Sequence, residues 1–209
     1  MNHTDRKKHW EKIYQTKTIN EVSWYEPTPT TSLAFLNTFQ IPIDAKIIDI
    51  GGGDSFFVDH LLALGYQNIT VLDISAAALE RAKLRIGRQA DLVKWIVADA
   101  ASFAPTEQYD FWHDRAAFHF LTSGQEIDQY LHIVQNNVTT NGILIIGTFS
   151  ESGPNKCSGI DTKQYSETSM ANRLKKYFEK IKCITVDHVT PFNTLQNFIF
   201  CSFKKLSAV

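Results

Sequence analysis

The chain has 209 residues, of which 44% are hydrophobic, and a formal net charge of −1. This length and composition suffice for one sizeable core, and no Pro-, Gly- or Ser-rich linker divides it, so we expect a single domain over residues 1–209. The near-neutral charge gives no footprint for nucleic acid or an anionic membrane, and no apolar run has the length of a signal peptide or a membrane span. We therefore expect a soluble, cytoplasmic protein whose partner is a small molecule or another protein.

The amino-terminal residues 1–30 predict a helix with an aromatic face. Trp10 and Tyr14 lie one helical turn apart, and Trp24 follows shortly before the helix-breaking Pro27 and Pro29.

A strand is predicted over residues 46–50, and it runs directly into Gly51, Gly52 and Gly53. Apolar side chains at helical spacing then indicate a helix that stops at Gly65. A strand followed by a glycine loop and a helix is typical of a cofactor-binding loop.

The alternation of strands and helices continues after this first unit. A strand over residues 69–72 ends at Asp73, and Ser75 is placed to cap a helix that stops at Gly87. Further strands are predicted over residues 93–98, 109–113 and 143–149, helices over 127–138 and 166–181, a turn at Asn141-Gly142, and two final strands over 183–189 and 196–203.

This order predicts an α/β fold with a doubly wound, Rossmann-like sheet of seven strands. The last two strands are separated only by the turn at residues 190–193, so they must be antiparallel. We expect a mostly parallel sheet in which the carboxyl-terminal hairpin contributes one antiparallel strand.

Acidic residues lie at the carboxyl ends of four of the predicted strands: Asp49, Asp73, Asp99 and Asp114. Ligands of doubly wound folds bind outside the carboxyl ends of the strands, where these four side chains would meet. The alternative is that each acid only caps the helix after it.

The glycine loop differs from that of a dinucleotide-binding protein. Phe56 stands where the third glycine of G-x-G-x-x-G belongs, and Asp54 adds negative charge to a helix start that would otherwise bind phosphate. Asp49, placed before the glycines, suits a cofactor that carries positive charge. Asp73 follows Gly53 at the distance expected of a ribose-binding acid. S-adenosylmethionine, with its ammonium and sulfonium groups, meets these conditions.

These residues resemble the first motif of the class I S-adenosylmethionine-dependent methyltransferases, D/E-x-G-x-G-x-G, with Ser55 in place of the last glycine. The chain is most similar to small bacterial enzymes of the methyltransferase 12 and 25 type. The resemblance implies that Asp49 lies near the methionine amino group, that Asp73 binds the ribose hydroxyls, and that Asp99 and Ala100 contact the adenine. The candidate cofactor-binding residues are Asp49, Gly51, Gly52, Gly53, Asp73, Ile74, Asp99, Ala100, Tyr14 and Trp24.

Methyl transfer depends mainly on alignment and on exclusion of water, so no nucleophilic triad is needed. Asp114 stands where the family places a residue beside the methyl group. His119 is the preferred candidate for a general base because imidazole titrates near neutrality, but its position between Phe118 and Phe120 favours a core or wall residue. The spacing of His113 and His119 fits no metal pattern, and we predict no metal site.

Two segments are candidates for closing the site. Residues 1–30 would form a lid over the cofactor, with their aromatic rings near the sulfonium. The polar loop over residues 150–159 has the length and composition of a gate for the methyl acceptor, or of a surface loop without function.

The three cysteines, Cys157, Cys183 and Cys201, are odd in number, lie far apart and lack CxxC spacing. Neither a disulfide framework nor a zinc site is indicated. We expect reduced, buried thiols.

The sequence thus predicts a methyltransferase that uses S-adenosylmethionine, releases S-adenosylhomocysteine and acts on a small molecule or a protein side chain. Nucleic-acid bases are disfavoured as acceptors, because residues 113–116 contain neither the Asp/Asn-Pro-Pro-aromatic motif nor a Pro-Cys nucleophile. A non-catalytic sensor or scaffold that binds the cofactor and an NAD-dependent oxidoreductase are the alternatives. The acceptor, the methylated atom and the oligomeric state stay open.

Overall fold

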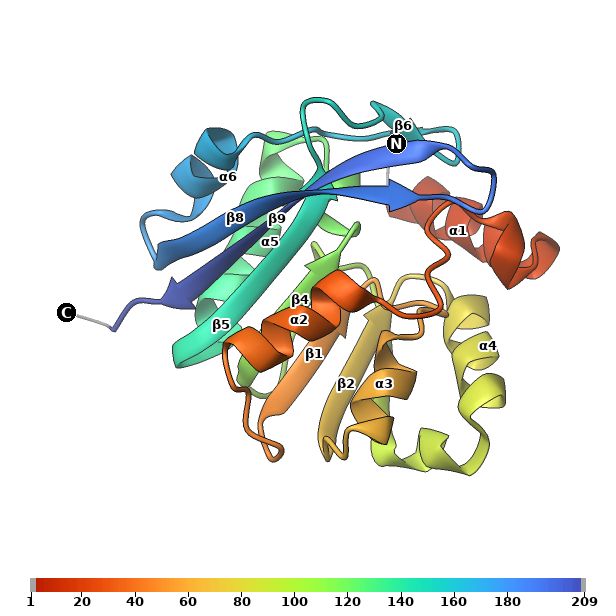
Figure 1. Ribbon diagram of the computed structural model, residues 1–209, viewed down its shortest axis with the longest axis horizontal. Helices are drawn as coiled ribbons and strands as arrows, with labels where there is room; N and C mark the ends of the chain where they lie inside the picture. Colours follow the sequence, from red (N-terminus) through yellow and green to blue (C-terminus); the bar gives the residue numbers. More distant parts are fainter. Residues whose placement is uncertain (1–2, 208–209) are drawn as a thin grey trace.

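The computed structural model describes residues 3–207 and has a seven-stranded sheet at its centre, with helices on both faces (Figure 1). The strand order across the sheet is β3-β2-β1-β4-β5-β9-β8. In chain order, the strands are β1 Lys46–Ile50, β2 Asn68–Asp73, β3 Val93–Val97, β4 Tyr109–Arg115, β5 Val138–Phe149, β8 Phe178–Val189 and β9 Leu195–Lys205.

The helices are distributed over both faces and one end of this sheet. They are α1 His3–Thr16, α2 Thr30–Thr38, α3 Phe57–Ala63, α4 Ala76–Ile86, α5 Gly124–Asn137 and α6 Glu167–Leu174. Short 3-10 turns cover Ile19–Glu21, Gly87–Leu92 and Phe118–Phe120, and β6 Lys156–Cys157 pairs with β7 Ile160–Asp161 in a small separate hairpin. Within residues 3–207, no helix combines the length and apolarity needed to cross a bilayer.

The predicted sheet is confirmed. Strands β1 to β5 are mutually parallel, while β9 runs antiparallel to both of its neighbours, β5 and β8. The short turn between β8 and β9 forces this reversal, as the sequence predicted.

Two apolar clusters fill the layers between sheet and helices. On one face, Tyr130 of α5 and Met170 of α6 are fully buried. On the other, Phe35 of α2, Phe57 of α3 and Leu79 of α4 pack against the sheet. The alternation of buried helix faces and apolar strands gives a three-layer sandwich whose open edge lies at the carboxyl ends of the parallel strands.

The predicted helix over residues 166–181 is wrong in its second half. Helix α6 ends at Leu174, and Phe178 already begins β8, where it pairs with Lys205. Ile181, expected to be buried on the helix, falls at a bulge of β8 and is 44% exposed. Backbone pairing with β9 outweighs the helical spacing of the apolar side chains, because strand pairing is a tertiary effect that local periodicity does not contain.

Two strand boundaries also differ from the prediction. Strand β4 continues to Arg115, so Asp114 lies inside a strand and not after it. The expected turn at Asn141-Gly142 is an irregularity within β5, where Asn141 has φ 65° and pairing with β4 is interrupted. Asn tolerates this left-handed conformation, so the chain bends without leaving the sheet.

The expectation of three reduced thiols is wrong for two of them. Cys183 and Cys201 face one another across β8 and β9 and form a disulfide, while Cys157 is a buried free thiol. Cysteine spacing did not reveal the pair, because it depends on the register of the hairpin. The disulfide weighs against the expected cytoplasmic location, since reducing compartments keep thiols reduced.

The disulfide predicts a selective labelling pattern and a stability difference. Under denaturing, non-reducing conditions, alkylation is expected to label Cys157 alone, with mass spectrometry as the readout. Reduction should lower the free energy of unfolding by about 3 kcal/mol, because the bond closes a loop of 18 residues in the unfolded chain. Urea titrations with and without reductant measure this, and Cys157→Ser serves as a control that keeps the bond. Three labelled thiols before reduction would contradict the pairing.

Candidate functional site

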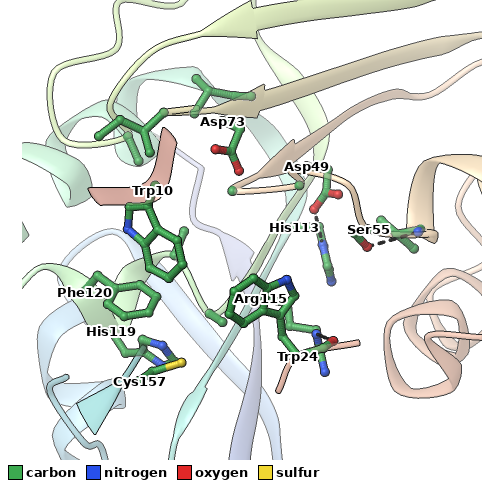
Figure 2. Close-up of a pocket in the computed structure, with 18 of the residues that line it drawn as sticks. Trp10, Trp24, Asp49, Ser55, Asp73, His113, Arg115, His119, Phe120 and Cys157 are labelled. Atoms are coloured by element: carbon green, nitrogen blue, oxygen red, sulfur yellow. Dashed lines mark hydrogen bonds and ion pairs between the residues drawn. The ribbon is translucent and has the colours of Figure 1, made fainter. Parts of the chain in front are cut away.

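A cavity opens at the carboxyl ends of the parallel strands, beneath α1 and beside α2. Figure 2 shows Asp49 and Asp73 at one end of it and His119 and Cys157 at the other. Strand ends, the glycine loop and the amino-terminal segment therefore all line one cavity.

The glycine loop lies so close to its neighbours that side chains would not fit. Gly51 has φ +66°, and a Cβ on it would lie 2.7 Å from Cβ of Ala117. On Gly52, a Cβ would lie 2.6 Å from Oδ2 of Asp49 and 2.7 Å from Cγ1 of Val71. The backbone of this loop consequently forms the floor of the cavity directly.

Two arginines of α4 hold the loop from behind. Arg85 donates hydrogen bonds to the carbonyl oxygens of Asp54 (2.7 Å) and Ser55 (2.8 Å) and pairs with Asp59. Arg81 pairs with the buried Asp54 carboxylate at 3.1 Å and donates to the carbonyl oxygen of Tyr14. Asp54 thus faces the arginine, and its negative charge is compensated within the protein.

Asp49 belongs to a buried hydrogen-bonded chain. Its Oδ1 lies 2.7 Å from Nδ1 of His113, and Nε2 of His113 lies 2.9 Å from Oγ of Ser32. Strand β1 places Asp49 directly opposite His113 of β4. This chain ties the floor of the cavity to α2 and uses both nitrogens of the imidazole.

Asp73, at the end of β2, accepts a hydrogen bond of 2.8 Å from the backbone N–H of Ser75. Burial, together with the negative charges of Asp54 and Asp49, raises the pKa of this carboxyl to about 7. A ligand that donates hydrogen bonds to the carboxylate would lower that pKa again.

Asp99, after β3, connects the sheet to the amino terminus. It accepts a hydrogen bond from the backbone N–H of Ala101 (2.8 Å) and pairs with Arg6 of α1 at 2.5 Å. Arg6 is buried and also pairs with Glu126 of α5 at 2.9 Å. A guanidinium shared between two carboxylates anchors α1 over this end of the cavity.

Aromatic rings from the amino-terminal segment form the roof. The ring centroid of Trp10 lies 5.6 Å from that of Trp24, 4.9 Å from that of Phe120 and 6.3 Å from that of Tyr14. Glu11 fixes the same helix from its other side by accepting a hydrogen bond from the Ser75 hydroxyl at 2.8 Å. The roof is therefore attached at both its apolar and its polar faces.

Comparison with known proteins finds a similar family for the part of the chain that forms the cavity floor. Residues 48–144, which contain the glycine loop and the strand-end acids, match the family model described as a methyltransferase domain, Methyltransf_12. This part of the chain, a little under half of its length, is similar to that family. The resemblance inferred from the glycine loop is confirmed.

Two curated relatives are similar to part of this chain. EEF1A lysine methyltransferase 2 of Homo sapiens is 29% identical over 82 residues, which are 35% of this chain and 35% of the relative. Nodulation protein S of Bradyrhizobium diazoefficiens is 25% identical over 104 residues, 50% of this chain and 49% of the relative. The chain thus spans between about a third and a half of the length of these curated relatives.

A solved structure extends the likeness in fold to most of the chain. The crystal structure of N-methyltransferase NodS from Bradyrhizobium japonicum WM9 in complex with S-adenosyl-L-homocysteine superposes with a TM-score of 0.66 at 14% identity. The match covers 85% of this chain and 86% of that one. The predicted Rossmann-like α/β fold is confirmed.

Most of the predicted site residues line one cavity. The residues that do so are Asp49, Gly51, Gly52, Asp73, Ile74, Asp99, Ala100, His119, Tyr14 and Trp24. Gly53 and Asp114 do not contribute to the lining. Gly53 lies beneath Tyr14, whose hydroxyl oxygen would be 2.8 Å from a Cβ added to the glycine.

Asp114 is buried and uses its carboxylate for hydrogen bonds within the protein. Its carboxylate accepts hydrogen bonds from the backbone N–H groups of Ala117 (3.0 Å) and Phe118 (3.1 Å) and from the Tyr130 hydroxyl (2.6 Å). Burial raises the pKa of this fully buried carboxyl to about 6. We therefore replace the prediction of a catalytic Asp114 with a role in holding the turn after β4.

His119 lines the cavity, but its surroundings contradict the prediction of a general base. Its Nδ1 accepts a hydrogen bond of 3.2 Å from the backbone N–H of Phe149. Burial and the nearby Arg115 lower the pKa of the imidazole to about 3. A nitrogen that is already engaged and this weakly basic cannot take a proton at neutral pH.

Sequence reasoning missed several residues of the cavity wall, among them Arg6, Ser32, Arg115 and Phe198. Arg6 stands in a short run of basic residues that resembles a solvated surface, and Phe198 stands in an apolar strand. No local pattern distinguishes them, because only the fold brings them to the cavity. Within residues 3–207, no group of three or more potential metal ligands is placed to hold a metal ion.

Because the glycine loop is closely packed, adding a single methyl group to it should destabilise the fold. Gly52→Ala is expected to lower the free energy of unfolding by about 1 to 3 kcal/mol, because the new Cβ overlaps Asp49 and Val71. Gly124→Ala is the matched control, since a Cβ there meets no atom within 4 Å. Its effect should stay within about 1 kcal/mol. Urea denaturation of both variants measures the difference, and equal stabilities would contradict the close packing of the loop.

Proposed function

We propose that this protein is an S-adenosylmethionine-dependent methyltransferase that acts on a small molecule. The observation that carries the proposal is the convergence of a side-chain-free glycine loop with three buried carboxylates, Asp49, Asp73 and Asp99, around one cavity. The human relative named as a lysine methyltransferase and the bacterial N-methyltransferase structure support the reaction class.

The residues present fit the cofactor. Asp73 would accept hydrogen bonds from the ribose hydroxyls, Asp99 and Ala100 would face the adenine, and Asp49 would lie toward the methionine amino group. Gly51 and Gly52 leave room for close approach of the backbone, and the Asp49 carboxylate suits a ligand that carries positive charge. When bound, the cofactor supplies a methyl group already activated by a sulfonium.

The protein's own contribution is alignment and exclusion of water. Positioning of two reactants lowers the barrier by about 7 to 11 kcal/mol in favourable cases. We propose that residues 1–30 act as a lid, in which the rings of Trp10, Tyr14 and Trp24 cover the site and interact favourably with a sulfonium. The role of residues 150–159 as an acceptor gate stays a proposal, in which Cys157 is the residue that reaches the cavity wall.

No histidine of the cavity is available as a base. His113 is bonded through both nitrogens, and His119 is weakly basic. The acceptor must therefore present a nucleophilic atom that carries a lone pair at neutral pH. We favour a small molecule over a protein side chain because aromatic rings, those of Trp10, Trp24, Phe120, Phe149 and Phe198, line much of the cavity wall.

The alternatives differ in observable ways. Phe56 argues against an NAD-dependent oxidoreductase, because it occupies the place of the third glycine of a dinucleotide-binding loop. The guanidinium of Arg85 lies over its ring, 4.4 Å from the centroid. A non-catalytic sensor would share the cofactor site and lack turnover.

Isothermal titration with S-adenosylmethionine, S-adenosylhomocysteine and NAD tests the cofactor. We expect the first two to bind and NAD to give no heat, because the loop lacks a pyrophosphate site. Binding of NAD alone would overturn the proposal. Transfer of labelled methyl to a panel of small amines, thiols and carboxylates, and to cell extract, tests turnover. Cofactor binding without any labelled product would favour the sensor.

The raised pKa of Asp73 predicts that cofactor binding depends on pH. The ribose hydroxyls bind the ionised carboxylate, so binding lowers its pKa from about 7 and releases a proton. Affinity for S-adenosylhomocysteine should therefore rise about tenfold from pH 6 to pH 8 and level off above that range.

Asp73→Asn is the control for this titration, because its amide does not ionise. The variant is expected to bind about ten- to a hundredfold more weakly, through loss of hydrogen bonds to a charged group. Its affinity should also be independent of pH over the same range. If the pH dependence persists in the variant, another group is responsible.

A further inference from the structure

The end of the cavity farthest from the glycine loop contains a buried polar atom without a partner. Nε2 of His119 is fully buried and forms no hydrogen bond within residues 3–207, although the residue lines the cavity. Buried polar atoms are nearly always satisfied, so an unsatisfied one at a cavity wall indicates a position for a ligand atom.

The hydrogen bond at Nδ1 determines whether Nε2 of His119 is a donor or an acceptor. Because Nδ1 accepts the backbone N–H of Phe149 at 3.2 Å, it carries no proton. A neutral imidazole has one proton, which must then lie on Nε2. Burial and Arg115 lower the pKa of the ring to about 3, so the imidazole is neutral at neutral pH and the hydrogen bond at Nδ1 sets its tautomer. His119 therefore presents a hydrogen-bond donor to the cavity.

The walls around this donor are aromatic. The imidazole stacks on Phe149, with ring centroids 4.3 Å apart, and meets Phe120 edge-on at 4.5 Å. Phe198 lies next to Phe149 at 4.8 Å. Flat apolar surfaces on several sides of one donor favour a planar ligand with a single polar edge.

Arg115 brings positive charge to the same end. Its guanidinium lies over the ring of Phe198 at 5.3 Å, donates to the carbonyl oxygen of Trp24 and pairs with Glu26 at 3.1 Å. A guanidinium has five N–H donors, so these two contacts leave others for a ligand. The partly exposed Glu26 offsets its charge, which suits an oxygen of low charge better than a phosphate.

We infer that the methyl acceptor is a small planar molecule bearing a carbonyl or carboxylate oxygen, which accepts a hydrogen bond from Nε2 of His119 and lies near Arg115. The inference rests on the proposed methyltransferase function and adds the chemical class of its acceptor. A lysine side chain does not meet this description, because its ammonium donates hydrogen bonds and accepts none.

Three probes of one size test the oxygen requirement: benzoate, benzamide and benzylamine. Each is titrated into the protein saturated with S-adenosylhomocysteine. Benzoate and benzamide are expected to bind at least about tenfold more tightly than benzylamine, which places a cation against His119 and Arg115. Tighter binding of benzoate than of benzamide identifies a carboxylate acceptor, and equal binding a carbonyl. Equal or tighter binding of benzylamine overturns the inference.

Two substitutions of His119 distinguish its role as a hydrogen-bond donor to the ligand from its role in the fold. Oδ1 of His119→Asn can still accept the N–H of Phe149, but the side chain does not reach the position of Nε2. His119→Gln restores an N–H donor at that position. We expect benzamide affinity to fall about two- to tenfold in the first variant and to recover in the second. His132→Asn, on the exposed face of α5, is the control and should bind like the unmodified protein.

A measurement on the unmodified protein keeps the test independent of these variants. Nitrogen-15 spectra of the imidazoles should show His119 protonated at Nε2 and unprotonated at Nδ1 from about pH 5 upward, with Nε2 shifting on addition of benzamide. A proton on Nδ1 would overturn the inference. S-adenosylhomocysteine binding is recorded separately. If it is absent, the proposed function fails; if it is present while both oxygen probes fail to bind, the acceptor class is wrong.

Discussion

The hydrogen bond between Asp49 and His113 is the interaction on which the site depends. The two residues are opposite one another on adjacent parallel strands, and Ser32 of α2 completes the chain. All three are buried, so loss of one partner would leave polar groups unsatisfied in the floor of the cavity. The same carboxylate lies against Gly52, which explains why the loop above it has no side chain.

The amino-terminal segment completes the cavity through contacts to elements far along the chain. Arg6 links α1 to the end of β3 and to α5, and Glu11 links it to the start of α4. Ion pairs with this little exposure act mainly through geometry, since desolvation offsets much of their attraction. They place Trp10 and Tyr14 at the wall of the cavity.

The two ends of the cavity have opposite chemical character, and this separates their functions. Carboxylates gather beside the glycine loop, where a cationic cofactor would bind, while His119 and Arg115 offer donors at the far end. Here the position of one backbone N–H, that of Phe149, decides the tautomer of His119 and turns an expected base into a hydrogen-bond donor. An acceptor that fits this end brings an oxygen to the donors and a lone pair to the methyl group.

The sequence by itself determined the sheet, the glycine loop and the acids Asp49, Asp73 and Asp99, because strand period, turn residues and motif spacing are local properties of the chain. Helix α6 was overextended, and the Cys183–Cys201 bond was missed, because both depend on the register of β8 with β9. Only the tertiary structure decided that Asp114 supports a turn, that Arg6 anchors the roof, and that His119 carries its proton on Nε2. Protonation and burial follow from neighbours distant in sequence, and no local pattern records them.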